Sequence, residues 1–242
     1  MTGPQGATKP LPFRIGLDAQ RSLLILGLVG SLTVATCNTI MCTHGDIAQW
    51  PEWSLRLAYW AGSFALAFAG LGFLPTYTML RPAGVLWAAP PAVLLGGFLA
   101  LGSAGHGSFF AHYRILRWLA LDPTLEPAIG GLRNEIALDN LVMLLIPVAV
   151  LFVGSMWYSA AILTRPTLYP RWMAGWNIFA ISAVVFGVAE TEVGGELVQG
   201  VARGLGFHLG VSGYFLLCLY TLSNARHPAA AVRTRASGSR TR

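Results

Sequence analysis

Long apolar stretches, each about the length of one membrane crossing, alternate with short polar segments along the chain. We expect six of them to be helices, because a helix of about 20 apolar residues spans the hydrocarbon core of a bilayer. A β-barrel would instead show alternating segments of about ten residues. The pattern predicts an all-α fold, a polytopic bundle of six transmembrane helices over residues 22–43, 55–80, 84–106 (continuing as an amphipathic helix toward Trp118), 134–163, 172–189 and 198–222.

The segments outside these stretches divide the chain into three parts. Residues 1–20 form a polar N-terminal segment, residues 21–223 the transmembrane domain, and residues 224–242 a basic tail that we expect to be disordered. The first apolar stretch has no cleavage site after it, so we interpret it as a helix that stays in the protein. Pro90 and Pro91 predict a kink in the third helix, because proline interrupts the helical hydrogen bonds.

Composition supports a membrane protein and argues against a nucleic-acid partner. The chain is 55% hydrophobic and 11% charged, with a mean hydropathy of +0.59, whereas soluble domains carry about 25% charged residues. The net charge of +6 would suggest nucleic acid in a soluble protein. Here the basic residues lie at helix ends and in the tail, where they control membrane topology.

The placement of charge predicts an orientation. With the N-terminus in the cytoplasm, most basic residues fall in cytoplasmic segments, as the positive-inside rule requires. We therefore expect both termini to be cytoplasmic in a multi-pass protein of the bacterial plasma membrane. Every acidic residue except Asp18 then lies at or near the opposite face. Acidic residues contribute little to membrane orientation, so the positive-inside rule does not explain why they gather at one face.

Ionisable side chains fall at the same membrane depth on five of the six predicted helices. A charge near the bilayer centre costs at least about 2.5 kcal/mol, so such residues normally face the bundle interior or a water-filled cavity. We therefore predict one polar cavity that opens toward the outer leaflet and has apolar and aromatic walls. The candidate catalytic residues are His106, Glu135, Asp139, Glu190 and Glu192.

The same helices carry aromatic and polar residues that are candidates for binding a substrate. A carboxylic acid in an apolar cavity stays protonated and acts as an acid, a second carboxylate or a histidine acts as the base, and aromatic rings stabilise a cationic intermediate. These groups favour an enzyme that cyclises or isomerises a lipophilic, isoprenoid-type molecule, and they also suit opening of a lipophilic epoxide. The candidate binding residues are Asn38, Asp46, Trp60, Phe109, Phe110, Trp157, Phe207 and His208.

Other interpretations of this cluster remain open. The carboxylates would equally serve a proton-coupled or small-molecule transporter, and the polar residues would equally join helices in a structural membrane subunit. Arg203 would neutralise one of the glutamates, and His208 alone is more often a packing residue. A metal set of His106, His112, His208 and Asp139 is a weak signal without an HExxH motif, and haem ligation is weaker, so we predict no metal and no cofactor.

Three motifs are similar to those of a known family. They are WPEWSLR (50–56), AGHGSFFAH (104–112) and TLYPRWMAGWN (167–177), and they resemble a family of uncharacterised bacterial membrane proteins, a domain of unknown function. The resemblance covers residues 20–223, implies the six-helix fold and brings no activity. It singles out His106, Ser108, Tyr169, Pro170 and Arg171. Where the family usually has Phe-Asn-Pro, this chain keeps only the asparagine, Asn177.

Overall fold

The computed structural model describes residues 15–43, 47–191 and 195–224, and in these ranges the chain contains helices and no strand. The all-α prediction is confirmed. Most of the predicted polar N-terminal segment and nearly all of the basic tail lie outside the described residues. The helices are α1 (Leu17–Thr43), α2 (Glu52–Leu71), α3 (Leu74–Leu80), α4 (Val85–Leu121), α5 (Glu126–Thr164), α6 (Ile178–Ala189) and α7 (Gly195–Asn224).

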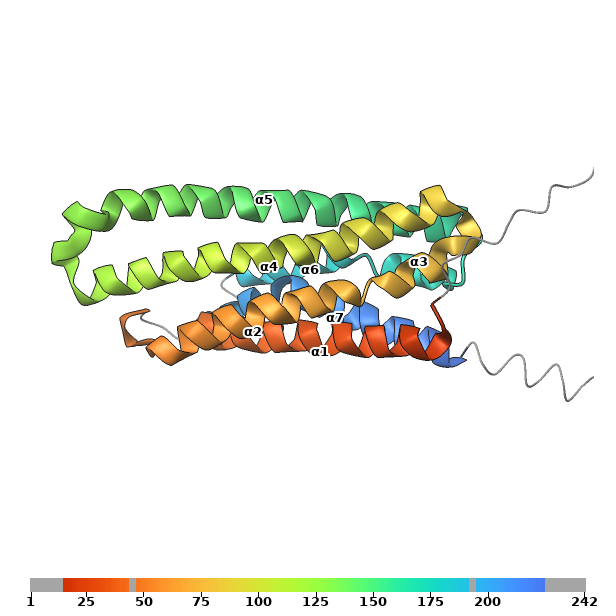
Figure 1. Cartoon of the computed structure of the whole chain (residues 1–242), viewed down its shortest axis with the longest axis horizontal. Helices are drawn as coiled ribbons and strands as arrows, with labels where there is room; N and C mark the ends of the chain where they lie inside the picture. The colour runs from red at the N-terminus through yellow and green to blue at the C-terminus, as the bar shows by residue number, and fades with distance from the viewer. Residues whose placement is uncertain (1–14, 44–46, 192–194, 225–242) are drawn as a thin grey trace, which may run out of the picture.

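The helices lie along one common axis and form an elongated bundle (Figure 1). α2 and α3 follow one another and together make one crossing. The first turn of α1 and the last turn of α7 lie at the same end of the bundle, beside α3 (Figure 1). At the other end, α4 and α5 form a hairpin that extends past the remaining helices (Figure 1).

Five helical segments have the length and composition of membrane spans, which marks the chain as a multi-pass membrane protein. They are α1, α2 with α3, α4, α5 and α7. The fifth predicted span, residues 172–189, is shorter than expected, because α6 has only 12 residues. At 1.5 Å per residue it is about 18 Å long, against a hydrocarbon core of about 30 Å.

The short α6 has a local cause in the sequence before it. The segment predicted to be its first turn is a 3-10 helix, Arg171–Gly175, and α6 begins only after Asn177. The Asn177 side chain accepts a hydrogen bond from the backbone N–H of Ala180 (3.0 Å), which is an N-cap. Its amide also donates to the carbonyl of Ser155 on α5 (3.1 Å), so the cap fixes α6 to α5.

Two other predicted boundaries differ from the structure. The second predicted helix divides at Gly72, whose position leaves no room for a Cβ because the backbone of Gly27 on α1 lies against it. α4 runs through Pro90 and Pro91, and the kink expected at these prolines stays a prediction. α5 begins eight residues before the predicted start, with Pro127 in its first turn, where a missing N–H costs nothing.

α7 is interrupted in its middle. Gly206 has φ 35° and ψ −121°, which is not helical and which a side chain would disfavour. The ring of Phe186 on α6 occupies the place that a Cβ on Gly206 would need. At membrane depth, non-helical backbone is tolerated where it is buried in protein or lines a cavity, and the surroundings of Gly206 meet this condition.

A chain of buried hydroxyl groups joins the helices near the end that carries α3. Tyr214 on α7 bonds to Thr76 of α3 and to Tyr169 of the loop between α5 and α6, each at 2.6 Å. Tyr169 lies outside the membrane spans, and burial raises its pKa well above the ordinary value, so its hydroxyl stays protonated. The Tyr169 motif that the family resemblance singles out thus has a structural role here.

Candidate functional site

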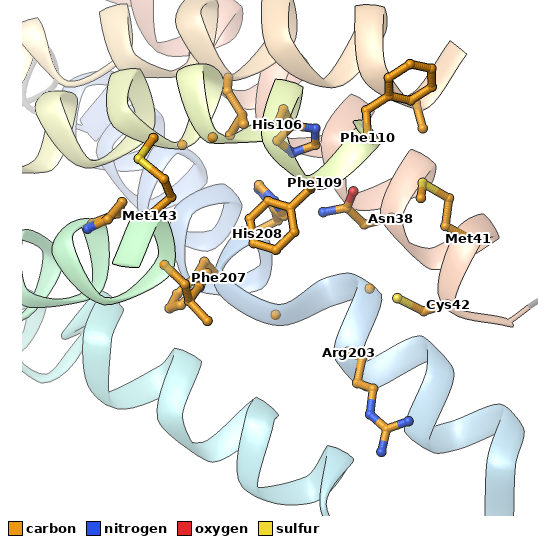
Figure 2. A pocket seen from close by; sticks show the side chains of 18 of the residues that line it. Asn38, Met41, Cys42, His106, Phe109, Phe110, Met143, Arg203, Phe207 and His208 are labelled. Atoms are coloured by element: carbon orange, nitrogen blue, oxygen red, sulfur yellow. The ribbon is translucent and has the colours of Figure 1, made fainter. Parts of the chain in front are cut away.

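A cavity of about 370 Å³ lies inside the bundle, and every long helix and α6 contribute to its wall (Figure 2). Most of the lining is apolar or aromatic. The lining residues are Asn38, Met41, Cys42, Leu55, Ala58, Tyr59, Leu66, Phe98, Leu99, Gly102, Gly105, His106, Phe109, Phe110, Tyr113, Met143, Leu144, Pro147, Val148, Phe186, Arg203, Gly204, Gly206, Phe207 and His208.

Small residues on α4 create part of this space. A Cβ on Gly105 would meet only the tip of Met143, at 4.0 Å, and a Cβ on Gly102 would meet only the tip of Leu66, at 3.7 Å. These are ordinary van der Waals distances to flexible side chains. The two glycines therefore leave this part of the cavity open, although the backbone conformation at these positions does not require glycine.

Aromatic rings in the wall contact one another. Phe207 packs edge-on against Phe98 (centroids 5.3 Å apart) and against Phe186 (4.9 Å). Tyr59 stacks on Phe110 at 4.8 Å. Aromatic pairs prefer edge-on and offset-stacked arrangements, so these contacts stabilise the aromatic part of the cavity wall.

Two histidines from different helices are the central polar groups of the cavity. His106 on α4 rests against Gly62 of α2, where a Cβ would collide with the imidazole. His208 on α7 is 7% exposed, and its Nδ1 is buried without a hydrogen-bond partner among the described residues. His106 and His208 lie near each other in the cavity (Figure 2).

The backbone around His208 is held by neighbouring helices. Its carbonyl accepts a hydrogen bond from the Ser31 hydroxyl of α1 at 3.3 Å. The carbonyl of Gly210 accepts one from the indole N–H of Trp176 at 3.0 Å. The interruption at Gly206 lies only two residues before His208, so α7 presents both irregular backbone and an imidazole to the cavity.

Arg203 borders the cavity but directs its charge elsewhere. Its guanidinium points away from the two histidines (Figure 2) and lies 3.6 Å from the carboxylate of Glu190. The prediction that Arg203 neutralises a glutamate is confirmed for this pair. Both side chains are largely exposed, so the ion pair contributes at most about 1 kcal/mol.

The predicted convergence of carboxylates and histidines is wrong for the described residues. Glu135 and Asp139 are exposed on α5, and Glu190 is exposed at the end of α6. None of the three lines the cavity. α5 has most of its contacts with α4 and few with the other helices, and the faces of α5 that carry Glu135 and Asp139 are exposed.

Some of the remaining predicted site residues lie outside the cavity, and others lie in its wall. Trp60 and Trp157 are exposed on the bundle surface, 57% and 37% respectively, and they do not line the cavity. Asp46 and Glu192 lie outside the described residues. The structure does bring together six of the predicted residues in the cavity wall, namely Asn38, His106, Phe109, Phe110, Phe207 and His208.

Several features of the site were not predicted. Tyr59, Tyr113 and Phe186 line the cavity, and the interruption at Gly206 shapes it. The run GLGFHLG (204–210) contained a signal, because glycine readily adopts non-helical backbone conformations and three glycines lie within these seven residues. Ser108, which the family resemblance singles out, donates a hydrogen bond to the buried Asn140 of α5 at 2.6 Å and therefore joins α4 to α5.

Weaker alternatives receive no geometric support from this arrangement. Within residues 15–43, 47–191 and 195–224, no three His, Cys, Asp or Glu side chains are grouped as a metal site would require.

No model of a known protein family, no curated protein and no solved structure matches the chain. The resemblance to a family of uncharacterised bacterial membrane proteins stays a prediction, and the function has to be argued from the cavity.

Proposed function

We propose that this protein is a membrane-embedded enzyme that binds a lipophilic small molecule in the cavity and acts on it by acid/base chemistry, with His106 and His208 as the proton-transferring groups. One observation carries the proposal: two imidazoles from different helices border a cavity inside the bundle whose wall is mostly apolar and aromatic. Glu135, Asp139 and Glu190 have no part in it, because they lie on the outside.

The composition of the wall supports a lipophilic ligand that carries a hydrogen-bonding group. Ligand sites of about 300–1,000 Å³ typically combine hydrophobic walls with a few polar groups that orient the ligand, and the volume of about 370 Å³ falls in this range. A buried polar atom without a partner is costly. A ligand hydroxyl or a water near His208 would remove that cost at Nδ1.

Isomerisation or cyclisation of an isoprenoid-type molecule is the reaction class that suits these groups. One imidazolium gives a proton to a carbon–carbon double bond, and the other imidazole takes a proton from a neighbouring carbon, so atoms and charge balance without a co-reactant. Imidazole gives and takes protons near neutral pH. The rings of Phe109, Phe110 and Phe207 border the same space and would stabilise the intermediate cation.

A carrier is the second candidate, and the interruption of α7 favours it. Secondary transporters bind their substrates at broken helices near the middle of the membrane, and Gly206 breaks α7 beside the cavity. Six helical segments without an evident internal repeat make a small frame for alternating access. We therefore favour the enzyme over the carrier.

Solvent deuterium distinguishes the two functions. Purified protein in detergent is incubated in D₂O with farnesol, an isoprenoid alcohol, or squalene, an isoprenoid hydrocarbon, and each molecule is recovered for mass spectrometry. The enzyme is expected to introduce deuterium at carbon and to yield an isomer. Uptake of the same molecules into proteoliposomes without any deuterium at carbon would contradict the enzyme and support the carrier.

A further inference from the structure

Three arginines converge on one carboxylate at the end of the bundle where the α4–α5 hairpin begins to extend. Glu52, in the first turn of α2, lies 2.9 Å from Arg114, 3.4 Å from Arg56 and 3.5 Å from Arg117. Arg114 and Arg117 come from α4. We call Arg56, Arg114 and Arg117 the arginine cluster. With Glu52 included, these four side chains carry two uncompensated positive charges.

The guanidinium groups are held in place and keep free donors. Arg114 lies over the rings of Phe110 (5.9 Å) and Trp118 (5.2 Å), which sandwich it along α4. The Nε of Arg117 donates to the carbonyl of Trp50 at 2.7 Å. Each guanidinium has five N–H donors, and the Nε of Arg114 is buried without a partner in the part of the chain that the structure describes.

The surroundings of the arginine cluster resemble a membrane–water interface. Trp53 and Trp118 flank it and are 65% and 42% exposed, and tryptophan is enriched where a helix passes from the hydrocarbon to the headgroups. Leu57, one turn of α2 further along, is 53% exposed and presents an apolar surface beside the arginines. A bound molecule would therefore meet positive charge and apolar surface together.

We propose that the arginine cluster binds the phosphate of an anionic phospholipid headgroup, with Glu52 holding the three guanidiniums in position. Guanidinium pairs with phosphate through two parallel N–H···O bonds, and several arginines around one phosphate add specificity. The exposed tryptophans and Leu57 favour a lipid over free phosphate, since acyl chains contact them. Glu52 and the three arginines do not line the cavity, so the proposal is independent of the function proposed for it.

Ligand-induced stabilisation tests the proposal. The full chain, delipidated in detergent, is titrated with dioctanoyl-phosphatidylglycerol, and the rise in its thermal unfolding midpoint gives an apparent dissociation constant. Dioctanoyl-phosphatidylcholine and inorganic phosphate are titrated in parallel. We expect phosphatidylglycerol to bind most tightly, and we expect Arg114→Gln and Arg56→Gln each to weaken its binding roughly tenfold, because each removes one charge-assisted contact.

Arg133→Gln is the matched control, because Arg133 lies on the same hairpin but pairs with Glu126 at 3.0 Å and is not among the three arginines that pair with Glu52. Its binding should equal that of the wild type. Should Arg114→Gln fail to fold, Arg56→Gln carries the test, since the side chain of Arg56 is 62% exposed. Equal binding of phosphatidylcholine, equal binding of inorganic phosphate, or equal weakening by Arg133→Gln would each overturn the proposal.

Discussion

Replacing His208 with glutamine is expected to lower deuterium incorporation into farnesol or squalene by about 10²- to 10⁴-fold, the usual contribution of a general acid or base. Glutamine is similar in size and polar, so the packing between Ser31 and the Gly206 interruption should persist. Incorporation is measured by mass spectrometry of the recovered isoprenoid. His106→Gln is expected to have an effect of the same order, because in the proposed reaction one imidazole supplies the proton and the other removes it.

His112→Gln provides the matched control. His112 lies on α4 six residues beyond His106 and does not line the cavity. Substitutions away from a site usually have small effects, so deuterium incorporation should stay within about twofold of the wild type. Wild-type incorporation by His208→Gln would rule out this imidazole as a proton-transferring group. An equal loss in His112→Gln would show that any histidine change disturbs the protein.

Gly30→Ala should destabilise the bundle strongly, by about 3 kcal/mol, the upper end of the usual cost of overpacking. A Cβ at this position on α1 would collide with the carbonyl oxygen of Ala65 and the amide nitrogen of Ala69 on α2. Both are backbone atoms, which cannot rotate away, so the two helices would have to separate. The measurement is the thermal unfolding midpoint in detergent, compared with the wild type.

Gly187→Ala tests whether this loss comes from the helix contact. Gly187 lies on α6, and a Cβ there would have no neighbour within 4 Å. Alanine favours a helix over glycine by up to about 1 kcal/mol, so the unfolding midpoint should stay unchanged or rise. A midpoint for Gly30→Ala equal to that of Gly187→Ala would mean that α1 and α2 do not approach as closely as described.

The sequence was sufficient to predict the helical class and most of the membrane spans, because hydrophobic length alone determines them. It failed where a local hydrogen bond decides the boundary. Trp172 to Trp176 continue the apolar pattern of the fifth predicted helix, but the N-cap at Asn177 starts α6 later. Asparagine is one of the residues that most often cap a helix N-terminus, but the apolar residues on both sides of Asn177 predict a continuous helix.

The candidate site was predicted only in part, because the sequence does not show which face of each helix points toward the cavity. His106, Phe109 and Phe110 are on α4, which is packed between α2 and α5, so most of its faces meet protein. Asp139 is on α5, which has most of its contacts with α4 and few with other helices, and Asp139 lies on an exposed face. One sequence gives the spacing of residues along a helix but not the rotation of that helix toward its neighbours. The carboxylates were therefore assigned to the interior incorrectly.

The proposed function requires above all that the cavity holds a lipophilic molecule. The decisive measurement is the amount of farnesol that the purified protein retains, quantified by mass spectrometry after removal of unbound ligand, for Gly105→Leu and Gly97→Leu. Both glycines are on α4; Gly105 lines the cavity, whereas a side chain at Gly97 enters open space. Because a leucine at position 105 would fill part of the cavity, Gly105→Leu should retain roughly tenfold less farnesol than the wild type. Gly97→Leu should retain the same amount as the wild type, and equal retention by the two variants would contradict binding in the cavity.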